Sequence, residues 1–87
     1  MVIKSANVDS PYFKLGLLIM NELAKSFGDI FKGKRKEVGL SQDEIALLSG
    51  IDRSYVGRIE RGEVNISLEK VYLLAKVIGC SPKDLLP

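Results

Sequence analysis

The chain has 87 residues, of which 46% are hydrophobic and 28% are charged, and its formal net charge is +2. These values describe one small folded domain, and so low a net charge does not by itself indicate a nucleic-acid partner. A single cysteine and the lack of histidine exclude an internal disulfide and remove the commonest general base and metal ligand, so we expect no enzyme, metal or cofactor. Because no apolar run of about 18 residues occurs, we expect no membrane span and a cytoplasmic location.

The N-terminal part of the chain predicts a helical extension. Residues 1–9 lack periodicity and predict an extended or frayed arm, whereas Ser10 followed by Pro11 is typical of a helix start. Apolar residues then recur at helical spacing, at Tyr12, Leu15, Ile19, Leu23 and Phe27, and the stripe is widened by Phe13, Leu17, Leu18 and Met20.

Two readings of this extension stay open. Gly28 weakens a helix, and Ser26 is a possible cap for a new one, so the chain forms either two helices, at about 11–26 and 27–38, or one long helix bent near Gly28. The wide apolar stripe needs a partner surface on its own domain, in a dimer interface or in a swapped protomer. An amphipathic membrane helix and ligand sensing are the further alternatives.

The second half of the chain repeats one pattern at four helix starts: an apolar residue, then Ser or Asp, then an apolar residue four positions later. This is the hydrophobic staple across an N-cap. The sets are Leu40, Ser41 and Ile45; Ile51, Asp52 and Val56; Ile66, Ser67 and Val71; and Cys80, Ser81 and Leu85. Glycines at 39, 50, 62 and 79 end the preceding helices. The pattern predicts helices at about 42–49, 53–61, 68–78 and 82–86.

The expected fold class is all-α. We predict a compact fold of five to six helices, because short loops between short helices force sharp crossings; residues 1–26 form an N-terminal arm and extra helix, and residues 27–87 form the main domain. The expected core consists of Ile30, Phe31, Ile45, Ala46, Leu48, Ile51, Val56, Ile59, Leu68, Val71, Leu74, Ala75, Ile78 and Leu85.

Residues 42–61 predict a helix-turn-helix, because two short amphipathic helices flank a turn at Gly50 and the small Ala46 lies where they approach. From residue 34 to 86 the sequence resembles the helix-turn-helix family of the lambda and 434 phage repressors, Cro and the xenobiotic-response-element regulators. The landmarks are GLSQ (39–42), IERG (59–62), LAKVIG (74–79) and SPKDLL (81–86). Within the family, DRSYVGRIERG (52–62) is most similar to the controller proteins of restriction–modification systems. The resemblance implies a lambda-repressor-like domain that binds double-stranded DNA in the major groove.

The resemblance also assigns roles to individual residues. It implies that the Gln42 amide binds a DNA phosphate, which suits a helix N-terminus. Arg53 and Ser54 open the recognition helix, and Arg53 can donate two hydrogen bonds to guanine. Gly57 and Arg58 follow one turn later on the same side. Family members usually carry a polar side chain at position 57, so Gly57 departs from the pattern and leaves the backbone open to close approach.

Further DNA contacts are expected around this helix. Tyr55 resembles a controller-protein tyrosine that touches the DNA backbone, although it could instead pack on the following helix. The resemblance places Arg61 and Asn65 near phosphate, and Lys36 belongs to a basic run, KGKRK at 32–36, that could steer DNA. Solvent-exposed arginines without a DNA role are the alternative for Arg53 and Arg58.

In phage-repressor relatives, the positions of Arg35 and Glu60 carry an ion pair that joins the first helix to the recognition helix, and we expect the same pair here. The family dimerises on two half-sites. The implied interface residues are Val64, Ile66, Tyr72, Val77 and Leu86, with Cys80 and Leu85 as further candidates; Leu85 could instead belong to the core.

The sequence therefore predicts a homodimeric, sequence-specific transcriptional regulator on a palindromic operator, of the restriction–modification controller type. A phage-type repressor or an antitoxin-type autoregulator is the alternative within DNA binding. A protein-interaction module that retains the fold is the alternative from another class, although it would show apolar anchors on the recognition face.

Overall fold

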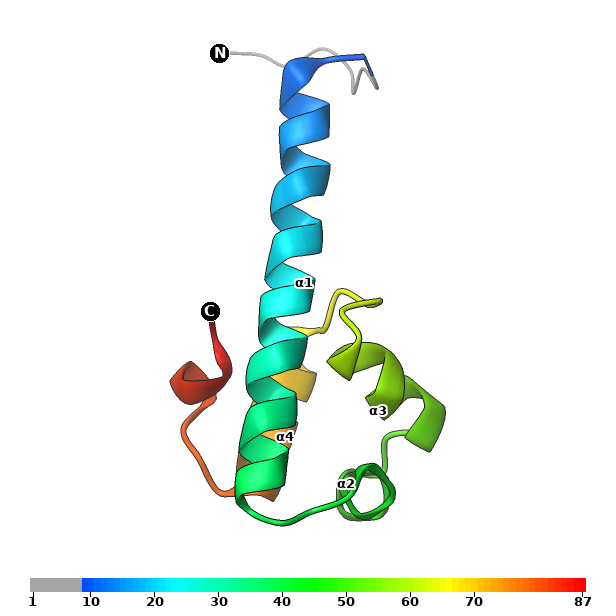
Figure 1. The fold of residues 1–87 in the computed structure, drawn as a ribbon, viewed down its shortest axis with the longest axis vertical. Helices are drawn as coiled ribbons and strands as arrows, with labels where there is room; N and C mark the ends of the chain where they lie inside the picture. Colours follow the sequence, from blue (N-terminus) through cyan, green and yellow to red (C-terminus); the bar gives the residue numbers. More distant parts are fainter. Residues whose placement is uncertain (1–8) are drawn as a thin grey trace.

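The computed structural model describes residues 9–87, and the arm expected at residues 1–9 lies outside them except for Asp9. Four α-helices and one 3-10 turn form this part of the chain (Figure 1). They are α1 (Pro11–Glu37), α2 (Gln42–Ser49), α3 (Arg53–Glu60), α4 (Leu68–Ile78) and η1 (Pro82–Leu85). The all-α class is confirmed. The described part has fewer α-helices than the expected five to six, because one helix replaces two at the N-terminus and the last segment is a single 3-10 turn.

Helix α1 is one continuous helix of 27 residues, so the reading with two helices is wrong. It begins where expected, since the Ser10 hydroxyl accepts a hydrogen bond from the Tyr12 amide and Pro11 follows the cap. Gly28 does not end the helix. It is buried against α3, where an added Cβ would lie 2.5 Å from the carbonyl oxygen of Ile59. The glycine therefore lets two helices approach closely, and the expected domain boundary at residues 26 and 27 falls inside α1.

The short helices form where the caps predict them. Ser41 and Glu44 make a reciprocal capping box at the start of α2, and the Ser67 hydroxyl accepts from the Lys70 amide at the start of α4. Gly50 adopts a φ of 75°, in the left-handed region that favours glycine, and this allows the sharp turn between α2 and α3. The Asp52 carboxylate does not cap α3 in the expected way; it accepts a hydrogen bond from the Ser54 hydroxyl.

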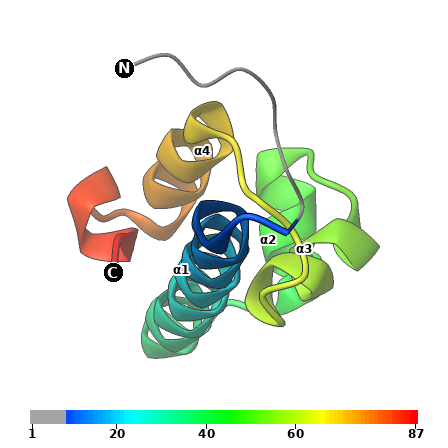
Figure 2. The ribbon, with the colours of Figure 1, turned by 90° about the horizontal axis from the view of Figure 1, so that it is seen from above.

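The core lies between α1 and the three shorter helices. Seen along α1, helices α2 and α3 lie on one side of it and α4 with the C-terminal turn on the other (Figure 2). The buried apolar residues are Phe27, Phe31, Ile45, Val56, Ile59, Val71, Leu74, Ala75, Ile78 and Leu85, with Ile30, Ala46 and Ile51 packed against them. Two core predictions are wrong, because Leu48 and Leu68 are mostly exposed, and Phe27 belongs to the core although it was not predicted there.

The N-terminal half of α1 projects beyond the rest of the domain (Figure 1). Its apolar side chains, from Tyr12 to Leu23, are exposed. Within residues 9–87, no helix combines the length and the apolar character that crossing a bilayer requires.

Candidate nucleic-acid interface

Helices α2 and α3 form a helix-turn-helix whose inner faces are locked into the core. Ile45 of α2 and Val56 of α3 are fully buried, and Ile59 is nearly so. The turn at Gly50 brings α3 across α2, and the outer side of α3 is left at the surface. The fold therefore presents one short helix whose N-terminal turn carries Arg53 and Ser54.

The side chains at the start of α3 make exposed, exchangeable contacts. Arg53 Nε donates to Asp43 Oδ1 at 2.9 Å, and the Arg53 side chain keeps 53% of its surface exposed. The Ser54 hydroxyl donates to Asp52 Oδ2 at 2.9 Å. Both acceptors are surface carboxylates, and an exposed ion pair of this kind contributes little to stability. Because the present contacts contribute little, a base edge or a phosphate can replace either of them at small cost.

Gly57 marks the point where three expected DNA-contacting side chains meet. A Cβ added there would lie 3.0 Å from Arg61 Nη1, 3.5 Å from Arg53 Nη1 and 3.8 Å from Gln42 Oε1. Gly57 is consequently buried under these side chains. The sequence suggested an open backbone at this position. In the structure, the missing side chain makes room for two guanidinium groups instead.

A buried polar network ties α3 to α1 and α2. Arg35 donates from Nε to Glu60 Oε2 at 2.6 Å and from Nη2 to Glu60 Oε1 at 3.1 Å, so the expected partners form a two-bond ion pair. The Gln42 amide donates to the same carboxylate at 2.8 Å, and Arg35 Nη1 donates to the Leu40 carbonyl at 2.9 Å. The network holds Glu60 between two donors that come from different helices.

The charge state of Glu60 follows from this network. Burial alone would raise the pKa of Glu60, but the hydrogen bonds from Arg35 and Gln42 and the nearby positive charge of Arg35 outweigh it and leave the pKa below its ordinary value. The hydrogen bond with Glu60 correspondingly raises the pKa of Arg35. Lys32, from the basic run, adds a smaller lowering effect on Glu60. The one carboxylate buried in α3 is thus ionised and compensated by a neighbouring cation.

Gln42, expected to contact phosphate, is engaged with Glu60 in the free protein. An amide nitrogen carries two hydrogens, so this bond leaves one hydrogen for a further acceptor. The side chain is half-buried at the first residue of α2, where helical backbone N–H groups also favour an anion.

Two cations lie near the Tyr55 ring, and one of them belongs to α4. Lys70 Nζ is 4.7 Å from the centre of the Tyr55 ring, and the Arg58 guanidinium carbon is 6.0 Å from it. Together with Ser54, these residues line a shallow depression beside the turn. Lys70 was not among the predicted site residues. The available signal was its place in the first turn of α4, three residues after the Ser67 cap, but nothing in the sequence places it against Tyr55.

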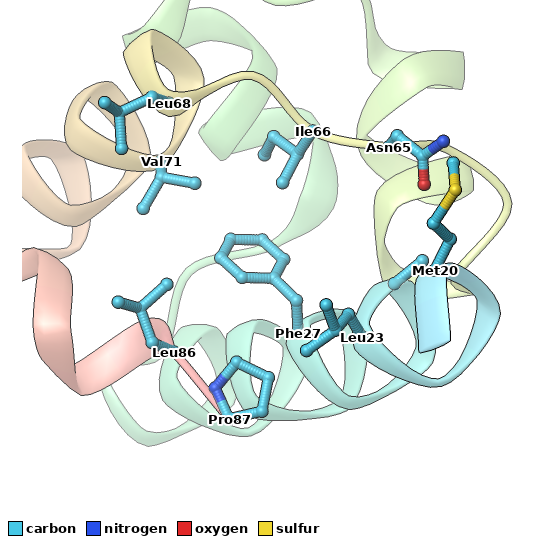
Figure 3. A pocket seen from close by; sticks show the side chains of 10 residues that line it. Met20, Leu23, Phe27, Asn65, Ile66, Leu68, Val71, Leu86 and Pro87 are labelled. Carbon is cyan, nitrogen blue, oxygen red and sulfur yellow. The ribbon is translucent and has the colours of Figure 1, made fainter. Parts of the chain in front are cut away.

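Of the remaining expected DNA contacts, Arg61 belongs to the cluster around Gly57, whereas Lys36 and Asn65 do not. Arg61 forms an exposed ion pair with Glu63, which raises the pKa of Arg61 and lowers that of Glu63. Lys36 is exposed in the last turn of α1. Asn65 is exposed at the rim of an apolar groove, beside Met20 (Figure 3). The structure thus brings Gln42, Arg53 and Arg61 around Gly57, and leaves Lys36 and Asn65 outside that cluster.

The expected dimer residues differ in exposure. Tyr72 and Leu86 keep more than half of their surface exposed. Val64, Ile66, Val77 and Cys80 are half-buried, and burial raises the pKa of the Cys80 thiol. Leu85 has no exposed surface and belongs to the core, so it is not an interface residue.

Comparison with known proteins agrees with this geometry. The helix-turn-helix family model matches residues 31–85. The chain is 40% identical over 47 residues to control protein C.BamHI of Bacillus amyloliquefaciens, a match that covers 54% of this chain and only 58% of that protein. It is 34% identical over 67 residues to control protein C.MunI of a Mycoplasma species, covering 76% of this chain and 90% of the relative.

A solved structure is also similar. The restriction-modification controller protein C.AhdI from Aeromonas hydrophila superposes with a TM-score of 0.70 at 43% identity, covering 72% of this chain and 96% of that one. With this structural match and a family model that spans more than half of the chain, the protein belongs to the helix-turn-helix family, among relatives that include control proteins of restriction–modification systems.

Proposed function

We propose that this chain is a sequence-specific, DNA-binding transcriptional regulator that acts in the cytoplasm as a homodimer on a palindromic operator, and that it controls a restriction–modification operon. The observation that carries the proposal is the outer side of α3, where Arg53 and Ser54 are exposed while the helix's carboxylate, Glu60, is buried and paired. The proposal includes no enzymatic step. The controller role draws on the names of C.BamHI and C.AhdI.

Arg53 is the residue assigned to base recognition. It is the first residue of α3, is half-exposed, and forms an ion pair with the surface carboxylate of Asp43. An arginine in the major groove recognises guanine by donating two bonds to O6 and N7, and such a pair contributes about 1–3 kcal/mol of discrimination. Ser54, one position on, would contact a base edge or a phosphate.

The cations around Arg53 are assigned to the DNA backbone. Arg58 and Lys70 flank Tyr55 beside the turn, and Arg61 lies over Gly57. Phosphate contacts of this kind fix the position and angle of the recognition helix and depend strongly on salt. The buried Arg35–Glu60 pair supports the arrangement, because an unpaired carboxylate at the end of α3 would repel the same phosphates.

The homodimer is part of the proposal because one short helix contacts only a few base pairs, and proteins of this type place two copies on half-sites about one helical turn apart. The candidate contact residues are Val64, Ile66, Tyr72, Val77 and Leu86, of which Tyr72 and Leu86 are the most exposed. A phage-type repressor or an antitoxin-type autoregulator would use the same face of α3, so only the identity of the operator separates those roles.

The test is a gel-shift titration with the DNA upstream of the gene and with an unrelated duplex of equal length. The wild type should prefer the upstream DNA, and Arg53→Ala should lose roughly 5- to 150-fold in affinity for it. Lys76→Ala, which removes an exposed cation from the far end of α4, is the matched control and should bind as the wild type does.

Salt dependence separates the two kinds of contact. Arg58→Ala or Lys70→Ala should weaken binding to both duplexes and reduce the slope of log affinity against log salt by about one. If the wild type binds both duplexes equally, the proposal of sequence-specific regulation is wrong. If the wild type binds neither duplex, a protein-interaction role is the better reading. Capture of a protein partner by the wild type should then be lost in Arg53→Ala.

A further inference from the structure

The projecting half of α1, residues 11–24, is here called the overhang. Its apolar side chains lie on several sides of the helix, and each keeps between 37% and 83% of its surface exposed. They are Tyr12, Phe13, Leu15, Leu17, Leu18, Ile19, Met20 and Leu23. An isolated helix of this length is only marginally stable in water, and a large exposed apolar patch on a small domain marks an interaction site.

One line of these residues continues the core face of α1. Phe13, Leu17, Met20, Ala24, Phe27 and Phe31 follow one another at alternating spacings of four and three residues. This is the heptad seam of a helix that packs on another helix. Phe27 and Phe31 are the part of the seam that packs inside the domain, where both are buried. Towards the N-terminus, Ala24 and Met20 of the same seam line a groove, and Met20, Leu17 and Phe13 remain exposed.

An apolar groove opens beside the base of the overhang. It has a volume of about 360 Å³ and lies between α1, the start of α4 and the C-terminus (Figure 3). Ala24 and Phe27 of α1 form one wall, and Leu68, Val71 and Leu86 lie across from them. Leu68 and Leu86 are exposed there although they are apolar.

We propose that the overhang pairs antiparallel with the overhang of a second copy of this chain, about a two-fold axis between Leu17 and Met20. In that register Leu17 faces Met20 of the partner subunit, and Phe13 faces Ala24 of the partner subunit. Because Ala24 lines the groove, the Phe13 ring of each copy enters the groove of the other. The proposal rests on the homodimer of the proposed function and adds the overhang to the surface that forms it.

The sequence of the overhang fits a copy of itself. The register sets the large Phe13 against the small Ala24. On the flank it sets Leu23 against Gly16, where an added Cβ would have open space among residues 9–87. In a two-fold contact each surface must supply both the large side chain and the small residue that it packs against, and the overhang contains both kinds. The seam itself contains no charged residue, so pairing buries no charge.

Charge also favours a second copy. The overhang's apolar side chains present on the order of 800 Å² per copy over all sides of the helix, of which the seam and its flank use about half, so the pairing enlarges the candidate dimer surface. A membrane surface is the rival occupant, but a helix that lies in a membrane interface is rich in cations on its polar face. The overhang carries one cation, Lys14, and one acid, Glu22. The groove is also continuous with the candidate dimer surface, since Ile66 and Leu86 belong to both.

The family model begins at residue 31, so the overhang lies outside the matched region. The pairing is therefore a property of this chain's own extension. It would fix the distance and angle between the two copies of α3, because α1 is continuous from the overhang to the contacts with α3.

Sedimentation equilibrium of the free protein tests the pairing. Leu17→Glu places a carboxylate in the seam and should weaken the dimer about ten-fold or more. Leu18→Glu is the matched control: it lies next to Leu17 and is similarly exposed, but points away from the seam, so its dimer should match the wild type. Equal effects of the two substitutions, or no effect of Leu17→Glu, would overturn the proposal. Circular dichroism of both variants checks that the domain is folded.

Cross-linking tests the register. Chains carrying Leu17→Cys and chains carrying Met20→Cys, both with Cys80→Ser, are mixed and oxidised. The antiparallel register predicts mixed dimers joined from 17 to 20, whereas dimers of like chains would indicate a parallel pair and overturn it. Monomers that bind phosphatidylcholine vesicles would assign the overhang to membrane instead. Arg53→Ala should stay dimeric while losing operator binding, so a failure of the pairing and a failure of the proposed function give different results.

Discussion

Replacing Glu60 with alanine should destabilise the fold strongly. The substitution removes both hydrogen bonds to Arg35, at 2.6 and 3.1 Å, and the bond from Gln42 at 2.8 Å. It leaves the Arg35 guanidinium buried, with 10% of its side-chain surface exposed, and with no carboxylate beside it. Removing one partner of a buried ion pair costs about 3–5 kcal/mol. In a domain with a total stability of about 5–15 kcal/mol, this is a large fraction.

The chain contains a matched control for this prediction. Arg61 and Glu63 form the same two-bond contact, at 2.7 and 3.3 Å, but their side chains are 59% and 48% exposed. Urea unfolding followed by helical circular dichroism compares the two variants directly. Glu60→Ala should shift the midpoint to much lower urea, whereas Glu63→Ala should leave it near the wild type, because water replaces the lost contact. Equal shifts in the two variants would refute the argument that burial makes the Arg35–Glu60 pair structural.

Two further predictions concern the same contact between α1 and α3. Gly28→Ala gains helix propensity but places a Cβ 2.5 Å from the Ile59 carbonyl oxygen, so overpacking should cost about 1–3 kcal/mol and lower the melting temperature. At Gly33 of the same helix an added Cβ has open space among residues 9–87, so Gly33→Ala should stabilise the fold by about 1 kcal/mol and raise the melting temperature. A Gly28→Ala variant that melts above the wild type would contradict the close packing. Because the pKa of Glu60 is lowered in the folded state, its contribution is fully present above the unfolded value of 4.5 and is lost as pH falls through the lower folded value. The urea midpoint of the wild type should therefore drop below about pH 4.5 more steeply than that of Glu60→Gln, and parallel profiles would contradict the assignment.

The sequence alone was sufficient for the bounds of α2, α3 and α4 and for the helix-turn-helix. Those bounds depend on caps and staples, which are contacts between residues at most five positions apart. Ser41 with Glu44, and Gly50 at a positive φ, act in the structure as their spacing predicted. Local chemistry of this kind does not depend on what the rest of the chain does.

The sequence was a poorer guide to which apolar faces are covered. Leu48 and Leu68 have helical spacing typical of a core but are exposed, and Phe27 is buried although it was not in the predicted core. Periodicity shows that a helix has an apolar side. It does not show how far the neighbouring helices extend over that side, and on α1 they stop well before the N-terminus (Figure 1).

The tertiary structure also decided the local environment of the candidate site. Gly28 is read in the sequence as a helix breaker, yet α1 continues through it, and a carbonyl of α3 occupies the space where a side chain would lie. The hydrogen bond from Gln42 to Glu60, and the position of Lys70 over Tyr55, join residues that lie 15 or more positions apart. The sequence determines this protein's short helices and its family because those signals are local. Packing between distant segments determines which donors surround Glu60, and within residues 9–87 it leaves the N-terminal half of α1 exposed.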